Sequence, residues 1–218
     1  DGTLLLGSAL LGWSGTDAGS GLALIEEVAI LTGTTSGNGY PTTQDAHQRS
    51  FSGGATDAVV TYLDVSSAGS SWTVHYSSYL GGEGDDAGIQ VVAAPSAEGA
   101  YPVAYVAGGT GSSNFPVGPV LMGGVVAQAN YGGGLDDAFV SRFAPGSVAT
   151  LQYAGTYVGG SGSDFVTGID YAAVSGTLGF CGVTTSTDLY WGGYVFQKDL
   201  APSMTNQPDG FVGFLKDN

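Results

Sequence analysis

The sequence is poor in cysteine and histidine. Its 218 residues include one cysteine and two histidines. The single thiol, Cys181, excludes an intrachain disulfide, and its apolar neighbours favour a small buried side chain over a nucleophile. No His-Glu-x-x-His, Cys-x-x-Cys, Gly-x-Ser-x-Gly or phosphate-binding loop motif occurs. We therefore expect a protein that is not an enzyme and needs no cofactor.

Basic side chains and long apolar runs are also scarce. Four Lys and Arg stand against 19 Asp and Glu, so the net charge is −15. The basic residues are Arg49, Arg142, Lys198 and Lys216. The negative charge repels phosphate backbones, which argues against a nucleic-acid partner. The apolar runs Leu4 to Leu11 and Val117 to Ala127 are too short to span a bilayer, so we expect no membrane insertion.

The acidic, lysine-poor composition suits a protein that works outside the cell or at the cell surface. The sequence begins at Asp1, without Met or a basic leader, which favours a mature or trimmed product. We therefore expect an extracellular or cell-surface location.

Glycine and β-forming residues are abundant. The sequence has 39 glycines, 12 tyrosines and nine phenylalanines, and hydrophobic residues make up 43% of it. The glycines have no three-residue period, which excludes collagen. The hydrophobic content is too high for a disordered chain. Short strands joined by tight glycine turns, and hence an all-β fold, are predicted.

Three signatures recur in the same order, three times each, at intervals of about 70 to 80 residues. The first is a glycine-rich turn that ends in aspartate, at Gly12 to Asp17, Gly81 to Asp86 and Gly159 to Asp164. The second is a glycine followed within about eight residues by an aromatic, at Gly33 and Tyr40, Gly108 and Phe115, and Gly182 and Tyr190. The third is an aspartate that opens an apolar run, at Asp57, Asp137 and Asp209. Such self-similarity indicates a repeat architecture.

The signatures divide the chain into three repeats within one continuous β domain. We place them at residues 1–72, 73–150 and 151–218. Each repeat is predicted to contain four strands bounded by Gly or Pro clusters. In the second repeat these are 73–80, 88–94, 101–108 and 138–143, with an irregular connection from Gly109 to Gly134. A four-stranded unit repeated head to tail is typical of antiparallel β-propeller blades.

The repeats resemble the SBBP (β-propeller) repeat of secreted and cell-surface proteins. The resemblance rests on the second repeat, in Tyr76 to Asp86, Tyr105 to Gly108, Ser113 to Pro116 and Tyr131 to Val140. The third repeat departs at Tyr190-Trp191, where the family favours Phe-Pro, and the first has Trp13 in place of a glycine. The resemblance implies a propeller fold and an extracellular setting, and it supplies no catalytic residues.

Three blades are too few for a closed ring, because propellers have about four to eight. We therefore expect a partial propeller, or one completed between molecules. Unclosed blades expose sheet edges and an apolar face. Surfaces that join head to tail grow into filaments unless the rotation closes. The chain is thus expected to bind itself, as a homo-oligomer, a filament or a surface layer.

The glycine-aspartate turns have two interpretations. We favour a structural one, in which glycines adopt turn conformations and Asp17, Asp86 and Asp164 accept backbone N–H bonds. Asp57, Asp137 and Asp209 are assigned the same role. The alternative is a calcium ion at Asp85 and Asp86 or at Asp136 and Asp137, because calcium prefers several oxygen ligands.

A binding module is the alternative function. Aromatic side chains near loops could stack on sugars, so cell-surface glycans are candidate partners of a carbohydrate- or calcium-dependent adhesion module. These aromatics are Trp13, Tyr40, Phe115, Tyr190, Trp191 and Tyr194. The interpretation that we favour is that such rings cap the blade cores. Glu26 and Glu27 interrupt two apolar runs and are predicted to form a solvated hairpin tip, not a catalytic carboxylate pair.

Overall fold

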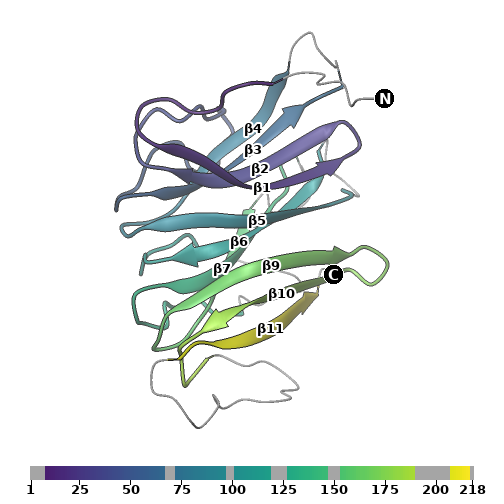
Figure 1. Ribbon diagram of the computed structural model, residues 1–218. Coiled ribbons are helices and arrows are strands. Elements are labelled where there is room, and N and C mark those ends of the chain that lie inside the picture. The colour runs from purple at the N-terminus through teal and green to yellow at the C-terminus, as the bar shows by residue number, and fades with distance from the viewer. Residues whose placement is uncertain are drawn as a thin grey trace, which may run out of the picture.

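The computed structural model describes residues 8–66, 72–96, 101–118, 127–146, 153–189 and 207–216. These residues form eleven β-strands and no helix (Figure 1). They accordingly include no helix long and apolar enough to cross a membrane. The predicted all-β class is confirmed.

The strands form three antiparallel sheets, none of which closes on itself. Sheet 1 comprises β1 (Asp17–Ile25), β2 (Val28–Thr35), β3 (Asp57–Asp64) and β4 (Thr73–Leu80). Sheet 2 comprises β5 (Asp86–Ala94), β6 (Val103–Thr110), β7 (Asp137–Phe143) and β8 (Tyr153–Val158). Sheet 3 has three described strands, β9 (Asp164–Ala172), β10 (Thr177–Thr184) and β11 (Asp209–Lys216). In each sheet the strands lie side by side in chain order.

The sheets are offset by one strand from the repeats expected from the sequence. β4 was expected to open the second repeat, but it pairs with β3, with Leu80 opposite Ala58. β8 likewise completes sheet 2, with Val158 opposite Ala138. Self-similarity sets the length of a repeat but not the strand at which a sheet begins, because pairing depends on which segments meet in space.

Each sheet begins with a strand that carries a β-bulge at the same place. The pairing shifts between Gly19 and Gly21 in β1 and between Gly88 and Gln90 in β5, and β9 has a shift opposite Gly182. A side chain at Gly33, Gly108 or Gly182 would collide with the backbone carbonyl of the facing first strand. The recurring glycine of the second signature is therefore required by close backbone contact at the bulge.

Two connections between strands, after β1 and after β6, were predicted from the sequence. Glu26 and Glu27 join β1 to β2 and are exposed, so the predicted hairpin tip is confirmed. The described parts of the connection after β6, residues 111–118 and 127–136, contain no strand. Tyr190, Trp191 and Tyr194 lie outside the described residues.

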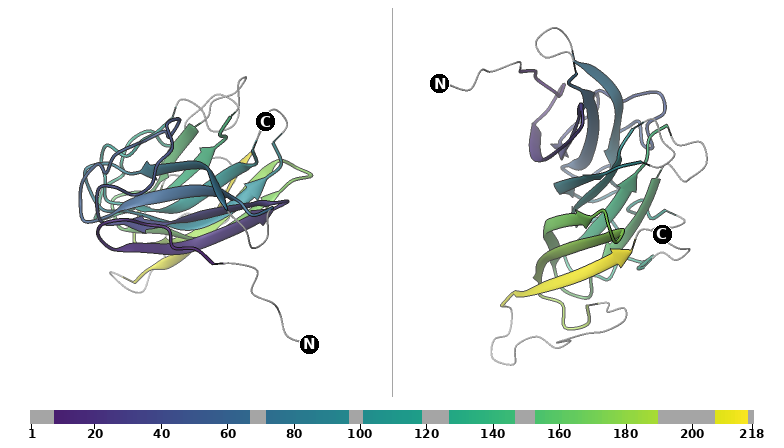
Figure 2. Two further views of the ribbon diagram at one scale, coloured as in Figure 1. Left: turned by 90° about the horizontal axis from the view of Figure 1, so that it is seen from above. Right: turned by 90° about the vertical axis from the view of Figure 1, so that its right-hand side faces the viewer.

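Two apolar clusters hold the sheets together. One lies between sheets 1 and 2 and includes Tyr62, Tyr76, Phe139 and Phe143. The Tyr62 hydroxyl donates a hydrogen bond of 3.2 Å to the Phe143 carbonyl, so this buried polar group is satisfied across the two sheets. The other cluster lies between sheets 2 and 3 and includes Tyr105, Val140, Leu178 and Phe211. The sheets thus stack in succession, with sheet 1 and sheet 3 at opposite ends (Figures 1 and 2).

Candidate functional site

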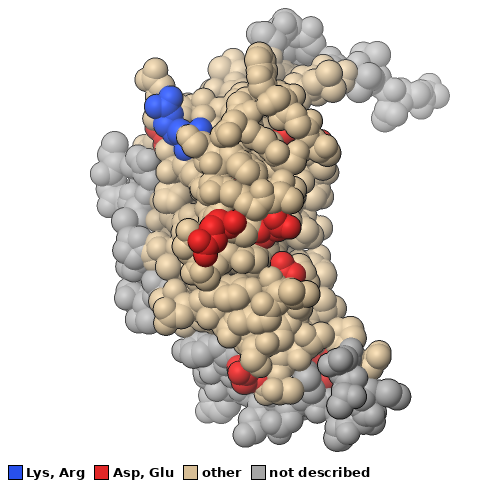
Figure 3. Space-filling view, turned by 90° about the vertical axis from the view of Figure 1, so that its left-hand side faces the viewer, with Lys and Arg blue, Asp and Glu red and all other residues tan. Residues whose placement is uncertain are grey.

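Aspartates gather at one edge of the stack. The first and third strands of every sheet begin with an aspartate, and the antiparallel pairing brings these strand starts to the same edge. The six residues are Asp17, Asp57, Asp86, Asp137, Asp164 and Asp209. Acidic side chains are visible on the corresponding face of the molecule (Figure 3), but Asp57, Asp86, Asp137 and Asp164 are buried and contribute almost nothing to that surface. We call this row the aspartate edge.

The aspartates that begin the first strands close the glycine-rich turns. Oδ2 of Asp17 accepts a hydrogen bond from the backbone N–H of Trp13 at 3.0 Å. Asp86 accepts the same bond from Gly82 at 2.7 Å, and Asp164 from Gly160 at 2.9 Å. The bond is made even where Trp13 replaces a glycine, because only the backbone donates.

The aspartates that begin the third strands bind the loop before them. Oδ2 of Asp57 accepts the backbone N–H of Ser52 at 2.8 Å, and Oδ2 of Asp137 accepts that of Gly132. Asp209 is half-buried at the start of β11. These contacts are those of a structural turn.

Two glutamines belong to the same edge but were not identified from the sequence. Gln48 donates to Asp57 Oδ2 at 3.2 Å and accepts the backbone N–H of Gly81 at 3.1 Å. Gln128 accepts the backbone N–H of Gly159 at 3.0 Å. Each glutamine lies nine residues before the aspartate of the third strand, and that spacing was the signal in the sequence.

The structure brings aspartates together in pairs that join neighbouring sheets. Asp57 lies near enough to Asp86, and Asp137 near enough to Asp164, for their charges to repel one another. All four side chains are buried. In each of them Oδ1 has no hydrogen-bond partner among the described residues. In each of these carboxylates, one oxygen therefore lacks a hydrogen bond, which is a costly arrangement for a buried charge.

Burial shifts the acidity of these carboxyl groups. It raises the pKa of Asp57 to about 7, although the N–H of Ser52 lowers the pKa, and the charge of Asp86 raises it further. Burial also raises the pKa of Asp137 to about 7 and that of Asp86 to about 6. Burial thus favours the protonated, neutral form of the Asp57, Asp86 and Asp137 carboxyl groups, which is less costly to bury than the charged form.

Calcium was the other interpretation of these acids. Asp85 is exposed and its carboxylate accepts the backbone N–H of Ala55, while Asp86 turns to the buried pair. Asp136 is half-buried, and burial and then the charge of Asp85 raise its pKa. Burial raises the pKa of its sequence neighbour Asp137, and the charge of Asp164 raises it further. Within the described ranges no three acidic, histidine or cysteine side chains come together as ligands. A calcium site at these residues stays a prediction.

The pair of Asp57 and Asp86 leaves no room for a side chain at Gly81. A Cβ there would lie 2.6 Å from Asp86 Oδ2 and 2.7 Å from Asp57 Oδ1. We therefore expect Gly81→Ala to lower the free energy of unfolding by about 1–3 kcal/mol, as overpacking does. Chemical denaturation measures this, with Gly19→Ala as the control, because a Cβ at Gly19 meets nothing within 4 Å. Equal stability of the two variants would contradict the tight packing at Gly81.

The loop aromatics that the structure describes are mostly buried. Tyr40 packs with Val59 and Tyr79 in a small cluster on the outer face of sheet 1. Phe115 belongs to the cluster between sheets 1 and 2. Trp13 is exposed. Tyr40 and Phe115 therefore serve as core caps and are not free to stack on a sugar.

Sheet 3 exposes an apolar surface that has buried counterparts in the other sheets. Val212 stands three residues after the aspartate of its strand, as Val60 and Val140 do in theirs. Val60 and Val140 are fully buried under the next sheet, whereas Val212 is 59% exposed. Beside it, Phe214 is 70% exposed and Val183 is also exposed. Cys181 is exposed as well, so the prediction of a buried thiol was wrong, because no described strand covers this side of sheet 3. We call these four residues the β11 face.

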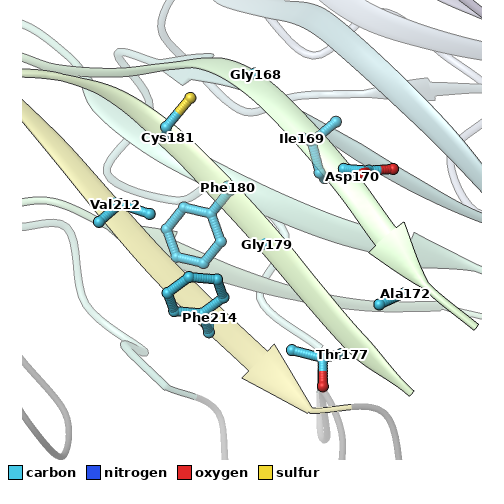
Figure 4. A pocket seen from close by; sticks show the side chains of 10 residues that line it. All are labelled: Gly168, Ile169, Asp170, Ala172, Thr177, Gly179, Phe180, Cys181, Val212 and Phe214. Atoms are coloured by element: carbon cyan, nitrogen blue, oxygen red, sulfur yellow. The ribbon is translucent and has the colours of Figure 1, made fainter. Parts of the chain in front are cut away.

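The β11 face borders a shallow hollow. Strands β9, β10 and β11 line it, and it has a volume of about 400 Å³ (Figure 4). Val212, Phe214 and Cys181 are among the lining side chains. The hollow is mostly apolar, so it offers few polar groups for a charged or sugar ligand.

Sheet 1 exposes the complementary surface at the other end of the stack. Leu22 and Leu24, five and seven residues after Asp17, are 65% and 67% exposed. At the same positions of β5, Val91 and Ala93 pack against sheet 1. At those of β9, Ile169 and Tyr171 pack against sheet 2. We call Leu22 and Leu24 the β1 face. An exposed apolar surface was expected from the sequence, but these residues were not identified there.

Comparison with known sequences does not assign a family, since neither a protein-family model nor a curated protein matches this sequence. The resemblance to SBBP repeats therefore rests on the motifs in the sequence and stays a prediction.

Proposed function

We propose that this protein is a non-enzymatic, extracellular structural subunit that assembles with copies of itself into a filament or surface layer. In this proposal the three sheets are propeller blades of the SBBP type. The observation that carries it is the presence of two unlike apolar faces at opposite ends of the stack. Each is the counterpart of a surface that is buried inside the protein.

The way in which the sheets pack supports self-assembly. The positions of the β11 face are covered in sheets 1 and 2 by the first strand of the following sheet. In β5 and β9, the residues that provide this cover are the counterparts of Leu22 and Leu24 in the β1 face. A second molecule that places its β1 on the β11 face would therefore repeat an interface that the fold already makes twice. Such a contact is heterologous and can continue from copy to copy.

The chemistry of the aspartate edge supports a structural role. Asp17, Asp86 and Asp164 accept hydrogen bonds from backbone N–H groups of turns. Four of the six carboxylates, those of Asp57, Asp86, Asp137 and Asp164, are buried. Groups committed in this way are poorly placed to act on a substrate. The excess of acidic over basic side chains keeps a glycine-rich protein soluble and is consistent with an extracellular location.

The size and shape of the native particle test the proposal. We expect light scattering to show concentration-dependent species larger than the 21.8 kDa chain, and negative-stain microscopy to show fibres or sheets. A disc the size of two chains would indicate a closed six-bladed ring and would favour the ligand-binding alternative. A compact monomer at every concentration would contradict the proposal.

A further inference from the structure

We infer that residues 3–11 of one copy add to the free edge of β11 in a second copy, as the fourth strand of its sheet 3. This inference rests on the proposed self-assembly and names its partner and its route. Among the described residues, β11 pairs only with β10, so no described strand lies along its outer edge. Sheets 1 and 2 each have a fourth strand at that edge. Adding a strand to an open edge is a general mode of recognition.

The sequence identifies the strand that matches this edge. β4 and β8 each run directly into a glycine-rich turn, at Gly81 and Gly159. The third copy of that turn begins at Gly12, and the residues before it are Thr3-Leu4-Leu5-Leu6-Gly7-Ser8-Ala9-Leu10-Leu11. This apolar run therefore holds the sequence position of a strand that would be the fourth of a sheet preceding sheet 1. It precedes sheet 1 just as β4 precedes sheet 2.

Contacts at Leu11 support the same equivalence. Leu11 packs against Tyr40, Val59 and Tyr79 on the outer face of sheet 1. Leu80, the last residue of β4, belongs to the cluster that contains Phe115, Phe139 and Tyr157. These three aromatics hold, in sheet 2 and its loop, the positions that Tyr40, Val59 and Tyr79 hold in sheet 1 and its loop. The end of the donated segment is thus already held as a fourth strand would be, while Leu10 is fully exposed.

The position of the open edge favours a second molecule over the same chain. β1 and β11 lie at opposite ends of the stack (Figures 1 and 2). Leu11 packs on sheet 1, at the end of the stack opposite to β11, which favours a second molecule as the source of the added strand. When β1 of a second copy covers the β11 face, residues 3–11 of that copy are brought to the edge of β11. In the same way, β4 pairs with β3 at the edge of sheet 1 and leads directly into β5, which covers sheet 1.

The register follows from the two existing pairs. Ala58 lies opposite Leu80, and Ala138 lies opposite Val158. Gly210 holds the equivalent position in β11 and should lie opposite Leu11 of the second copy. Counting along the antiparallel ladder then places Val212 opposite Ala9. Both residues are exposed in the described structure.

Cysteine cross-linking tests the strand and its register. Two variants, Ala9→Cys and Val212→Cys, each also carry Cys181→Ser, because Cys181 lies beside Val212. They are mixed, assembled together and oxidised, so any cross-link between residues 9 and 212 joins two molecules. Opposite residues of an antiparallel ladder lie within the range of a disulfide. The control replaces Ala9→Cys with Ser8→Cys, which should point to the other face of the sheet.

We expect the pair 9 and 212 to give at least about tenfold more covalent heterodimer than the pair 8 and 212, because side chains alternate along a strand. Assembly without this preference would overturn the donated strand and leave the proposed self-assembly in place. If no assembly occurs at any concentration, the proposed function fails as well. Chains carrying both Ala9→Cys and Val212→Cys should give either a closed small ring or a ladder of covalent oligomers, and both contain the donated strand.

Discussion

Replacing Val212 with aspartate should abolish assembly. In the proposed interface this side chain is buried against β1 of a second copy, as Val60 and Val140 are buried within the chain. Burying a valine contributes about 1.5–3 kcal/mol, and burying an unpaired carboxylate costs more. We expect association to weaken by at least about 100-fold, which corresponds to about 2.7 kcal/mol. Sedimentation velocity of the variant should show monomer at concentrations where the natural chain is assembled.

The control is Val174→Asp, which makes the same chemical change at a fully exposed residue of the turn between β9 and β10. It should assemble normally. If Val212→Asp assembles as well as Val174→Asp does, the β11 face is not an interface.

A complementation experiment shows whether the interface joins unlike faces. Leu22→Asp should also be monomeric, because it damages the β1 face. A mixture of Leu22→Asp with Val212→Asp retains one intact β11 face and one intact β1 face. It should therefore form heterodimers and nothing larger. If the interface instead joined two identical faces, the mixture would give no heterodimer.

Acidification from pH 8 to pH 5 should stabilise the fold. The folded pKa is raised from the ordinary value of 3.8 to about 7 in Asp57 and Asp137, and to about 6 in Asp86. The folded state thus binds protons more tightly than the unfolded state. The resulting stability is complete below about pH 4 and is lost as the pH rises through 6 to 7. Because a tenfold change in the acidity of a group on folding is worth about 1.4 kcal/mol, we expect a loss on the order of several kcal/mol by pH 8.

Thermal melting across this pH range is the measurement, made at two protein concentrations because assembly also raises the melting temperature. Hydrogen bonds from Ser66 and Ser161 lower the pKa values of the half-buried Asp64 and the exposed Asp188, respectively. Their contribution is lost only as the pH falls below about 4. The melting temperature should therefore be highest near pH 4 to 5. A melting temperature that rises steadily toward pH 8 would contradict the buried pairs.

The double variant Asp57→Asn with Asp137→Asn should be more stable than the natural chain at pH 8 and less sensitive to pH. An asparagine oxygen can still accept the N–H of Ser52 or Gly132, and its amide N–H₂ replaces the orphaned Oδ1 near the partner carboxylate. Calcium provides the contrasting test. If the pairs held a cation, calcium would raise the melting temperature at pH 8, whereas carboxyl groups that bind no cation should leave it unchanged.

Much of the fold follows from patterns that are local in the sequence. Alternating apolar runs bounded by glycine place the strands, and the recurring glycine-aspartate turns mark where first strands begin. Asp17, Asp86 and Asp164 close these turns through backbone N–H groups a few residues away. Such contacts could be anticipated because both partners lie in the same short segment. The glycines that the bulge requires, Gly33, Gly108 and Gly182, could also be recognised, because they recur at the same position in each repeat.

The sequence by itself therefore determined the all-β class and the aspartates that open the first and third strands of each sheet, because both depend on short-range patterns of turn and strand residues. Only the tertiary structure decided that β4 completes sheet 1, that Asp57 meets Asp86, and that Val212 is exposed while Val60 is buried. These features depend on which distant segments lie side by side. Two valines at the same repeat position differ only in whether another sheet follows theirs, and no local pattern contains that information.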